Sequence, residues 1–148
     1  MSRKKITQQI VVGSIIFYKR KILILKRNHS ENFLPNFWEL PSGKKRLSEG
    51  IKTCLIRETK EEAGILVKPM QVFNIFEYKI EKKDEIKKCI QINYFVNLVK
   101  KMKISLSDEH KDFTWISEKE LYKYKMSKKT TKTIQKAFLF IKENGIIQ

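Results

Sequence analysis

The segment 43–65, GKKRLSEGIKTCLIRETKEEAGI, constrains the fold more than any other part of the chain. Within it, Glu58, Glu61 and Glu62 stand at positions i, i+3 and i+4, so on a helix they share one face about one turn long. Three carboxylates this close repel one another unless a cation lies between them. Oxygen ligands of this kind suit Mg²⁺ or Mn²⁺ better than Zn²⁺. The segment therefore predicts metal-assisted chemistry on an anionic substrate.

The same segment predicts a helix with a loop before it. The helix is expected to open at Ser48 or Glu49 and to end at Gly64, which acts as a C-terminal cap. Its buried stripe recurs every four residues, at Ile51, Leu55, Thr59 and Ala63. Pro69 follows soon after and prevents the helix from continuing.

Hydrophobic periodicity predicts the remaining elements. The expected strands cover residues 8–18, 21–26, 37–40, 72–80, 89–99 and 113–116. The basic residues 18–21 form the turn of a first hairpin, and the charged run 81–88 is expected to be the solvent-exposed loop of a second one. Pro41-Ser42-Gly43 is expected to stop the short strand before it. A capping box at 117–120 opens a brief helix, and a C-terminal helix covers 127–144.

Length and composition indicate one folded domain, residues 1–148, of the α/β class. A hydrophobic fraction of 41% with 11% aromatic residues argues against disorder. No apolar run approaches the roughly 20 residues that span a bilayer, so no membrane association is expected. Strands and helices follow one another without linkers or repeats, which favours helices packed on a central sheet.

The net charge of +16 comes from 27 Lys and only 5 Arg, spread along nearly the whole chain. Surfaces that read nucleic acid usually rely on arginine and interleave aromatic residues with the basic ones. The diffuse pattern favours a lysine-coated surface over a nucleic-acid surface. Cys54 and Cys89 lack metal-type spacing, so they are interpreted as reduced core thiols of a cytoplasmic protein.

The carboxylate segment follows the pattern G-x5-E-x7-R-E-U-x-E-E-x-G-U, in which U is an apolar residue. The matching positions are Gly43, Glu49, Arg57, Glu58, Glu61, Glu62, Gly64 and Ile65. This pattern resembles the Nudix box, the signature of hydrolases that cleave nucleoside diphosphates linked to another moiety. Thr59 departs from it, since an aliphatic residue is usual there, and its methyl group is expected to pack on the sheet.

The resemblance extends beyond the box. Residues 37–44, FWELPSGK, are similar to the strand and turn that precede it in the family, and 108–110 with Trp115-Ile116 are similar to a downstream acidic loop and strand. The fold implied is the Nudix α/β/α sandwich with a mixed sheet.

The resemblance also implies a metal site and a set of catalytic residues. Mg²⁺ or Mn²⁺ would be held by Glu58, Glu61, Glu62 and the backbone carbonyl of Ser42. Arg57 would orient a catalytic carboxylate, and Glu49 would brace the loop.

Either Glu58 or Glu109 would be the general base for the attacking water, with a metal ligand as the alternative role of Glu109. Arg27, Gly43 and Lys44 are the expected substrate-binding residues, with Gly43 permitting a backbone conformation that a side chain would obstruct. His110 either contacts phosphate or has a structural role.

The resulting functional hypothesis is a Mg²⁺-dependent pyrophosphohydrolase acting on a small-molecule nucleotide, most readily a nucleoside triphosphate, including an oxidised one. Two alternatives stay open. One is a hydrolase of dinucleoside polyphosphates or of other nucleoside diphosphate derivatives. The other is a non-catalytic protein of the same fold that binds a nucleotide or RNA.

Overall fold

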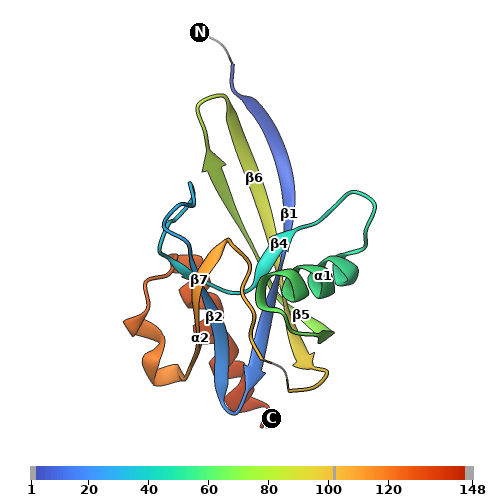
Figure 1. Cartoon of the computed structure of the whole chain (residues 1–148), viewed down its shortest axis with the longest axis vertical. Helices are drawn as coiled ribbons and strands as arrows, with labels where there is room; N and C mark the ends of the chain where they lie inside the picture. Colours follow the sequence, from blue (N-terminus) through green and yellow to red (C-terminus); the bar gives the residue numbers. More distant parts are fainter. Residues whose placement is uncertain (1–2, 102, 146–148) are drawn as a thin grey trace.

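The structure, a computed structural model, describes residues 3–101 and 103–145 and is built around a seven-stranded mixed sheet with a helix on each face (Figure 1). The described elements are β1 Lys5–Tyr18, β2 Lys21–Arg27, β3 Trp38–Glu39, β4 Ser42–Lys44, α1 Ile51–Ala63, β5 Val67–Glu81, β6 Glu85–Leu98, β7 His110–Ile116, the 3-10 helix η1 Glu118–Lys123 and α2 Lys128–Glu143. The predicted α/β class with a mixed sheet is confirmed. Within these ranges no helix is long and apolar enough to cross a membrane.

The long strand β1 organises the sheet. One edge of β1 pairs in parallel with β6 over residues 5–16, and β6 pairs in turn with the edge strand β5. The other edge pairs with β2 only next to the turn, where Lys19 and Arg20 have positive φ. Beyond that turn β1 and β2 diverge. The chain from β3 to β4 fills the space between them, because β3 pairs with β2 and β4 with β1.

Two separate hydrophobic cores hold the layers together. On one face α1 packs over Val12, Ile16 and Leu23, and on the other α2 packs over Ile15, Ile22 and Ile24. Successive residues of β1 and β2 therefore serve opposite cores, as the alternation of side chains along a strand requires. The sheet is buried on both faces at its centre, which explains why residues 11–17 are apolar in nearly every position.

The structure differs from the prediction at three places around the acidic segment. The helix begins at Ile51 after Gly50, and not at Ser48 or Glu49, because the Glu49 carboxylate accepts a bond from the Arg46 N–H within the loop. The short strand does stop before Pro41, as predicted, but its expected end point is followed by a further strand: Ser42–Lys44 form β4, since the open edge of β1 is there to pair with them. The last predicted strand begins three residues earlier, at His110, where β7 pairs with β2.

The second hairpin also differs from the prediction. The charged residues expected in a loop over 81–88 lie mostly in β5 and β6, and only residues 82–84 connect the two strands. The end of the sheet here extends beyond both helices (Figure 1), so charged side chains remain in water while the backbone pairs. Pro69 lies inside β5, which an edge strand tolerates next to its register shift.

The unusual Thr59 of the acidic segment pairs with the sheet through its hydroxyl group. Its Oγ1 lies 2.7 Å from Ser14 Oγ on β1 and donates to the Leu55 carbonyl at 2.7 Å. Both residues are at least 99% buried. A threonine at this position is therefore explained by the Ser14 hydroxyl on the facing strand, to which its own hydroxyl bonds. Packing of its methyl group, as expected from the sequence, would not by itself require a hydroxyl.

This pairing predicts a measurable coupling. Thr59→Val leaves the Ser14 hydroxyl buried without its partner, so it should lower the free energy of unfolding by about 1–3 kcal/mol. The double variant Ser14→Ala/Thr59→Val should cost less than the sum of the two single variants, by roughly 1 kcal/mol. Urea unfolding of the four proteins measures this difference, and strict additivity would show that the two hydroxyls do not interact.

Candidate active site

The Arg57 guanidinium joins the loop before α1 to the acidic face of the helix. Its Nε and Nη2 donate to the two oxygens of Glu49 at 2.9 and 2.6 Å, and Nη2 also donates to the Lys44 carbonyl at 3.1 Å. Its Nη1 donates to Glu58 at 2.7 Å and to Glu61 at 3.2 Å. The hydrogen bond from Arg57 lowers the pKa of the Glu49 carboxyl to about 2. Such a two-pronged contact needs the planar fork of arginine.

The Glu58 carboxyl lies directly over Gly43. A Cβ atom on Gly43 would stand 2.0 Å from Glu58 Cδ, so only glycine leaves room for this carboxyl. Gly43 has no positive φ, which corrects the predicted reason for a glycine here: the requirement is space and not an unusual backbone conformation. Burial raises the pKa of Glu58, and the bond from Arg57 opposes that rise.

Glu62 is the buried carboxylate of the group, with 4% of its surface exposed. Its Oε2 accepts the N–H of Ser42 at 3.0 Å, which ties β4 to α1. Burial raises the pKa of Glu62 well above its ordinary value, and the charges of Glu39, Glu109 and Glu58 act in the same direction. A buried carboxylate surrounded by like charges needs a proton or a cation, which supports the predicted need for a metal.

The residues that meet Glu62 are the first residue of β7 and the residue just before it. One ligand atom each from Glu62, Glu109 and His110 lies within 4.8 Å of the other two. His110 is buried, and its Nε2 lies 2.8 Å from Glu39 Oε2 on β3. Glu39 was not among the predicted site residues. It meets His110 only because β2 pairs with both β3 and β7, and no local signal in the sequence indicates that pairing.

A second feature missed from the sequence is a stack of side chains beside this acidic group. The Arg27 guanidinium carbon lies 5.9 Å from the centre of the Phe33 ring, and that ring stacks on Tyr78 at 6.0 Å with an angle of 18°. Arg27 donates to the Phe33 carbonyl at 2.7 Å and to Glu39 at 3.1 Å. Arg27 is therefore held on the β2 side of Glu39, next to an aromatic surface.

The other predicted site residues lie around the same point but differ in exposure. The side chain of Glu61 is about half exposed and bonded to Arg57, outside the group formed with Glu62. Lys44 is exposed at the end of β4. Ser42 reaches Glu62 through its N–H, so its carbonyl as a metal ligand remains a prediction.

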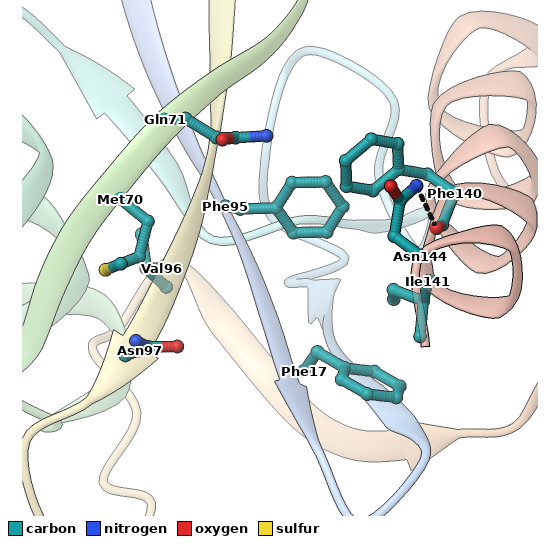
Figure 2. A pocket seen from close by; sticks show the side chains of 9 residues that line it. All are labelled: Phe17, Met70, Gln71, Phe95, Val96, Asn97, Phe140, Ile141 and Asn144. Carbon is teal, nitrogen blue, oxygen red and sulfur yellow. Dashed lines mark hydrogen bonds between the residues drawn. The ribbon is translucent and has the colours of Figure 1, made fainter. Parts of the chain in front are cut away.

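A cavity of about 360 Å³ lies between α2 and the paired ends of β5 and β6 (Figure 2). Three phenyl rings and three side-chain amides supply most of its lining, with no ionisable group. The lining residues are Phe17, Met70, Gln71, Phe95, Val96, Asn97, Phe140, Ile141 and Asn144. None of the predicted site residues lines this cavity.

Comparison with known proteins agrees with this geometry. The family model described as NUDIX domain matches residues 7–137. Among curated proteins, the chain is 34% identical over 73 residues to "8-oxo-dGTP diphosphatase" from Buchnera aphidicola subsp. Schizaphis graminum, covering 49% of this chain and 55% of that protein. A protein of the same name from Buchnera aphidicola subsp. Acyrthosiphon pisum is 37% identical over 60 residues, covering 40% of this chain and 45% of that one. The chain thus spans about half the length of the curated relatives it matches.

Solved structures share the whole fold. The MutT protein from Methanosarcina mazei Go1 superposes with a TM-score of 0.74 at 25% identity, over 98% of this chain and 100% of that one. The C. elegans Ap4A hydrolase binary complex gives a TM-score of 0.67 at 22% identity, over 91% and 98% of the two chains. The second likeness concerns the fold alone.

Because the Glu62 carboxylate is buried, we expect the free energy of unfolding of the metal-free protein to depend on pH. Because the folded-state pKa of Glu62 is raised, the folded chain holds this proton after the unfolded chain has lost it, so stability falls as pH rises above about 4.5. Glu62→Gln removes that loss and keeps an acceptor for the Ser42 N–H. In EDTA at neutral pH the variant should be more stable than the wild type, by the order of 1 kcal/mol.

Urea unfolding at pH 4.5 and pH 7.5 tests this, since the stability difference should shrink at the lower pH. Equal stability of the two proteins at pH 7.5 would contradict it.

Proposed function

The chain belongs to the Nudix family, and we propose that it is a metal-dependent pyrophosphohydrolase that cleaves a phosphoanhydride bond of a nucleoside triphosphate. The single observation that carries this proposal is the position of Glu62, buried within reach of Glu109 and next to the Glu58 carboxyl that Arg57 holds. If the acidic helix face were only a solvated surface, no carboxylate on it would be buried among three others, because such burial opposes its ionisation.

The donor set fits a hard divalent cation, Mg²⁺ or Mn²⁺. Glu62 and Glu109 would hold it, with Glu61 and the Ser42 carbonyl as further ligands implied by the family pattern, while Glu58, the remaining ligand of that pattern, is assigned to another role. When bound, such a cation would neutralise phosphate oxygens and lower the pKa of an attacking water. The like charges around Glu62 support this assignment, because a bound cation would attract each carboxylate and so offset the repulsion among them.

We assign the general base to Glu58. Its carboxyl is oriented by Arg57 and by the space above Gly43, and burial raises its pKa toward the range in which a base works best. Glu109, the other candidate, stands with Glu62 and His110 and is assigned to the metal. Glu49 braces Arg57 and so holds Glu58 indirectly.

The nucleoside end is proposed to bind on the side of Phe33 and Tyr78. Their stacked rings lie next to Arg27 and Glu39, so a base placed there would leave its phosphates near the acidic group. Arg27 and the exposed Lys44 are proposed to contact the substrate. An oxidised purine such as 8-oxo-dGTP is the first substrate to test, because the curated relatives carry that name.

We also propose that residues 1–148 form one domain that works in the cytoplasm on a small nucleotide. Both cysteines are buried and unpaired, as expected in a reducing compartment.

Substrate profiling tests the function directly. The full chain with Mg²⁺ is incubated with 8-oxo-dGTP, ordinary nucleoside triphosphates, dinucleoside polyphosphates and sugar nucleotides, and the products are identified. We expect a nucleoside monophosphate and pyrophosphate from a triphosphate. Glu58→Gln should lower kcat by about 10²–10⁴-fold with little change in KM, whereas Glu109→Gln should mainly weaken metal binding. No turnover of any of these nucleotides by the wild type would refute the proposal.

Gly43 offers a second prediction with a matched control. In Gly43→Ala the new methyl group displaces the Glu58 carboxyl, so kcat should fall by about 100-fold. In Gly50→Ala the methyl group meets no atom within 4 Å, and kcat should change by less than about twofold. Thermal unfolding shows whether both variants fold, and similar kcat values for the two folded variants would count against the role of Glu58.

A further inference from the structure

His110 is buried in the acidic group with one ring nitrogen bonded and the other free of protein partners. Its side chain has no exposed surface, and its Nε2 lies 2.8 Å from Glu39 Oε2. Within the described chain, Nδ1 is buried and has no hydrogen-bond partner. Only one other buried side-chain polar atom in those ranges shares this condition, Ser107 Oγ.

The contacts of Glu39 determine which ring nitrogen carries the proton. Glu39 also accepts from Arg27 at 3.1 Å, so its carboxylate is the acceptor and His110 Nε2–H is the donor. In the neutral ring Nδ1 then keeps a lone pair in a buried place that offers it no donor. A buried polar atom without a partner requires an explanation. A bound cation would provide one, because the side chains around His110 are acidic.

Those surroundings consist of the carboxylates of Glu62 and Glu109. An oxygen of each lies within 4.8 Å of the other and of a His110 ring nitrogen. Ligand atoms about 2.1 Å from a shared ion lie up to about 4.2 Å apart, and the 4.8 Å within which these three atoms fall is close to that separation. The Glu39 contact fits this arrangement, because a histidine that binds metal commonly donates its other N–H to a carboxylate.

We propose that His110 Nδ1 is a nitrogen ligand to the divalent cation held by Glu62 and Glu109, and that Glu39 orients it. This deepens the proposed function, on which it rests for the role of the ion. A nitrogen ligand departs from the all-oxygen set predicted from the acidic segment. It favours transition ions such as Mn²⁺ and Co²⁺ over Mg²⁺, since imidazole binds them more strongly.

The chain is well suited to a spectroscopic test, because His29 and His110 are its only histidines. Mn²⁺ is bound to the full-length protein without nucleotide, and electron spin echo modulation from directly bound ¹⁴N is recorded. We expect this signal in the wild type and its replacement by a ¹⁵N signal when histidine is ¹⁵N-labelled. Absence of nitrogen coupling in the wild type would overturn the proposal without any variant being needed.

Two substitutions locate the nitrogen. His110→Gln keeps an amide N–H near the Nε2 position to donate to Glu39 but removes Nδ1. It should abolish the coupling and weaken Mn²⁺ binding about tenfold or more, while Mg²⁺ binding, measured by competition, should change much less. His29→Gln, which changes an exposed histidine, should leave the signal and both affinities unaltered. Coupling that persists in His110→Gln, or equal losses of Mn²⁺ and Mg²⁺ affinity, would refute the assignment.

Glu39→Gln separates ligation from orientation. It should retain the ¹⁴N coupling and lower Mn²⁺ affinity about tenfold, as loss of a partner behind a metal ligand does. Because the spectra need no turnover, this inference and the proposed hydrolysis fail separately. Nitrogen coupling without hydrolysis would refute only the activity, and hydrolysis without nitrogen coupling would refute only the ligand.

Discussion

The contact on which the site depends is that of Arg57 with the carboxylates around it. One guanidinium binds Glu49 with two nitrogens, reaches Glu58 and Glu61 with a third, and also binds the Lys44 carbonyl. The loop before α1 is therefore held against the helix at both of its ends. Without the Arg57 guanidinium the neighbouring carboxylates would repel one another, and the loop would lose its side-chain contact with the helix. The same guanidinium bonds the Glu58 carboxyl, which lies over Gly43.

The site lies where the regular pairing of β1 with β2 is interrupted. The β1 and β2 strands diverge beyond their turn, and the short strands β3 and β4 fill the space between them. That insertion brings the Ser42 N–H to Glu62 and places Glu39 beside His110. Burying Glu62 among other carboxylates opposes folding of the metal-free chain. The arrangement is explained by what it binds, because stability alone does not favour it.

Much of the fold could be predicted because its signals are local. The apolar alternation of β1 and β2, the capping box at 117–120 and the cap at Gly64 each depend on residues close in sequence. Errors arose where pairing overrode composition, as in 81–88, where charged residues form strands, and in 42–44, where a turn signal forms β4. A free strand edge supplies hydrogen bonds whatever the side chains are.

The sequence by itself determined the family and the acidic helix face, because a helix converts the spacing of Arg57, Glu58 and Glu62 into neighbouring side chains without help from the rest of the chain. Only the tertiary structure decided which acid is buried and which neighbours it meets. The Glu39–His110 contact joins residues 71 positions apart, and it exists because β2 pairs with β3 on one edge and with β7 on the other. No local pattern encodes such a pairing, since its register is set by the sheet as a whole.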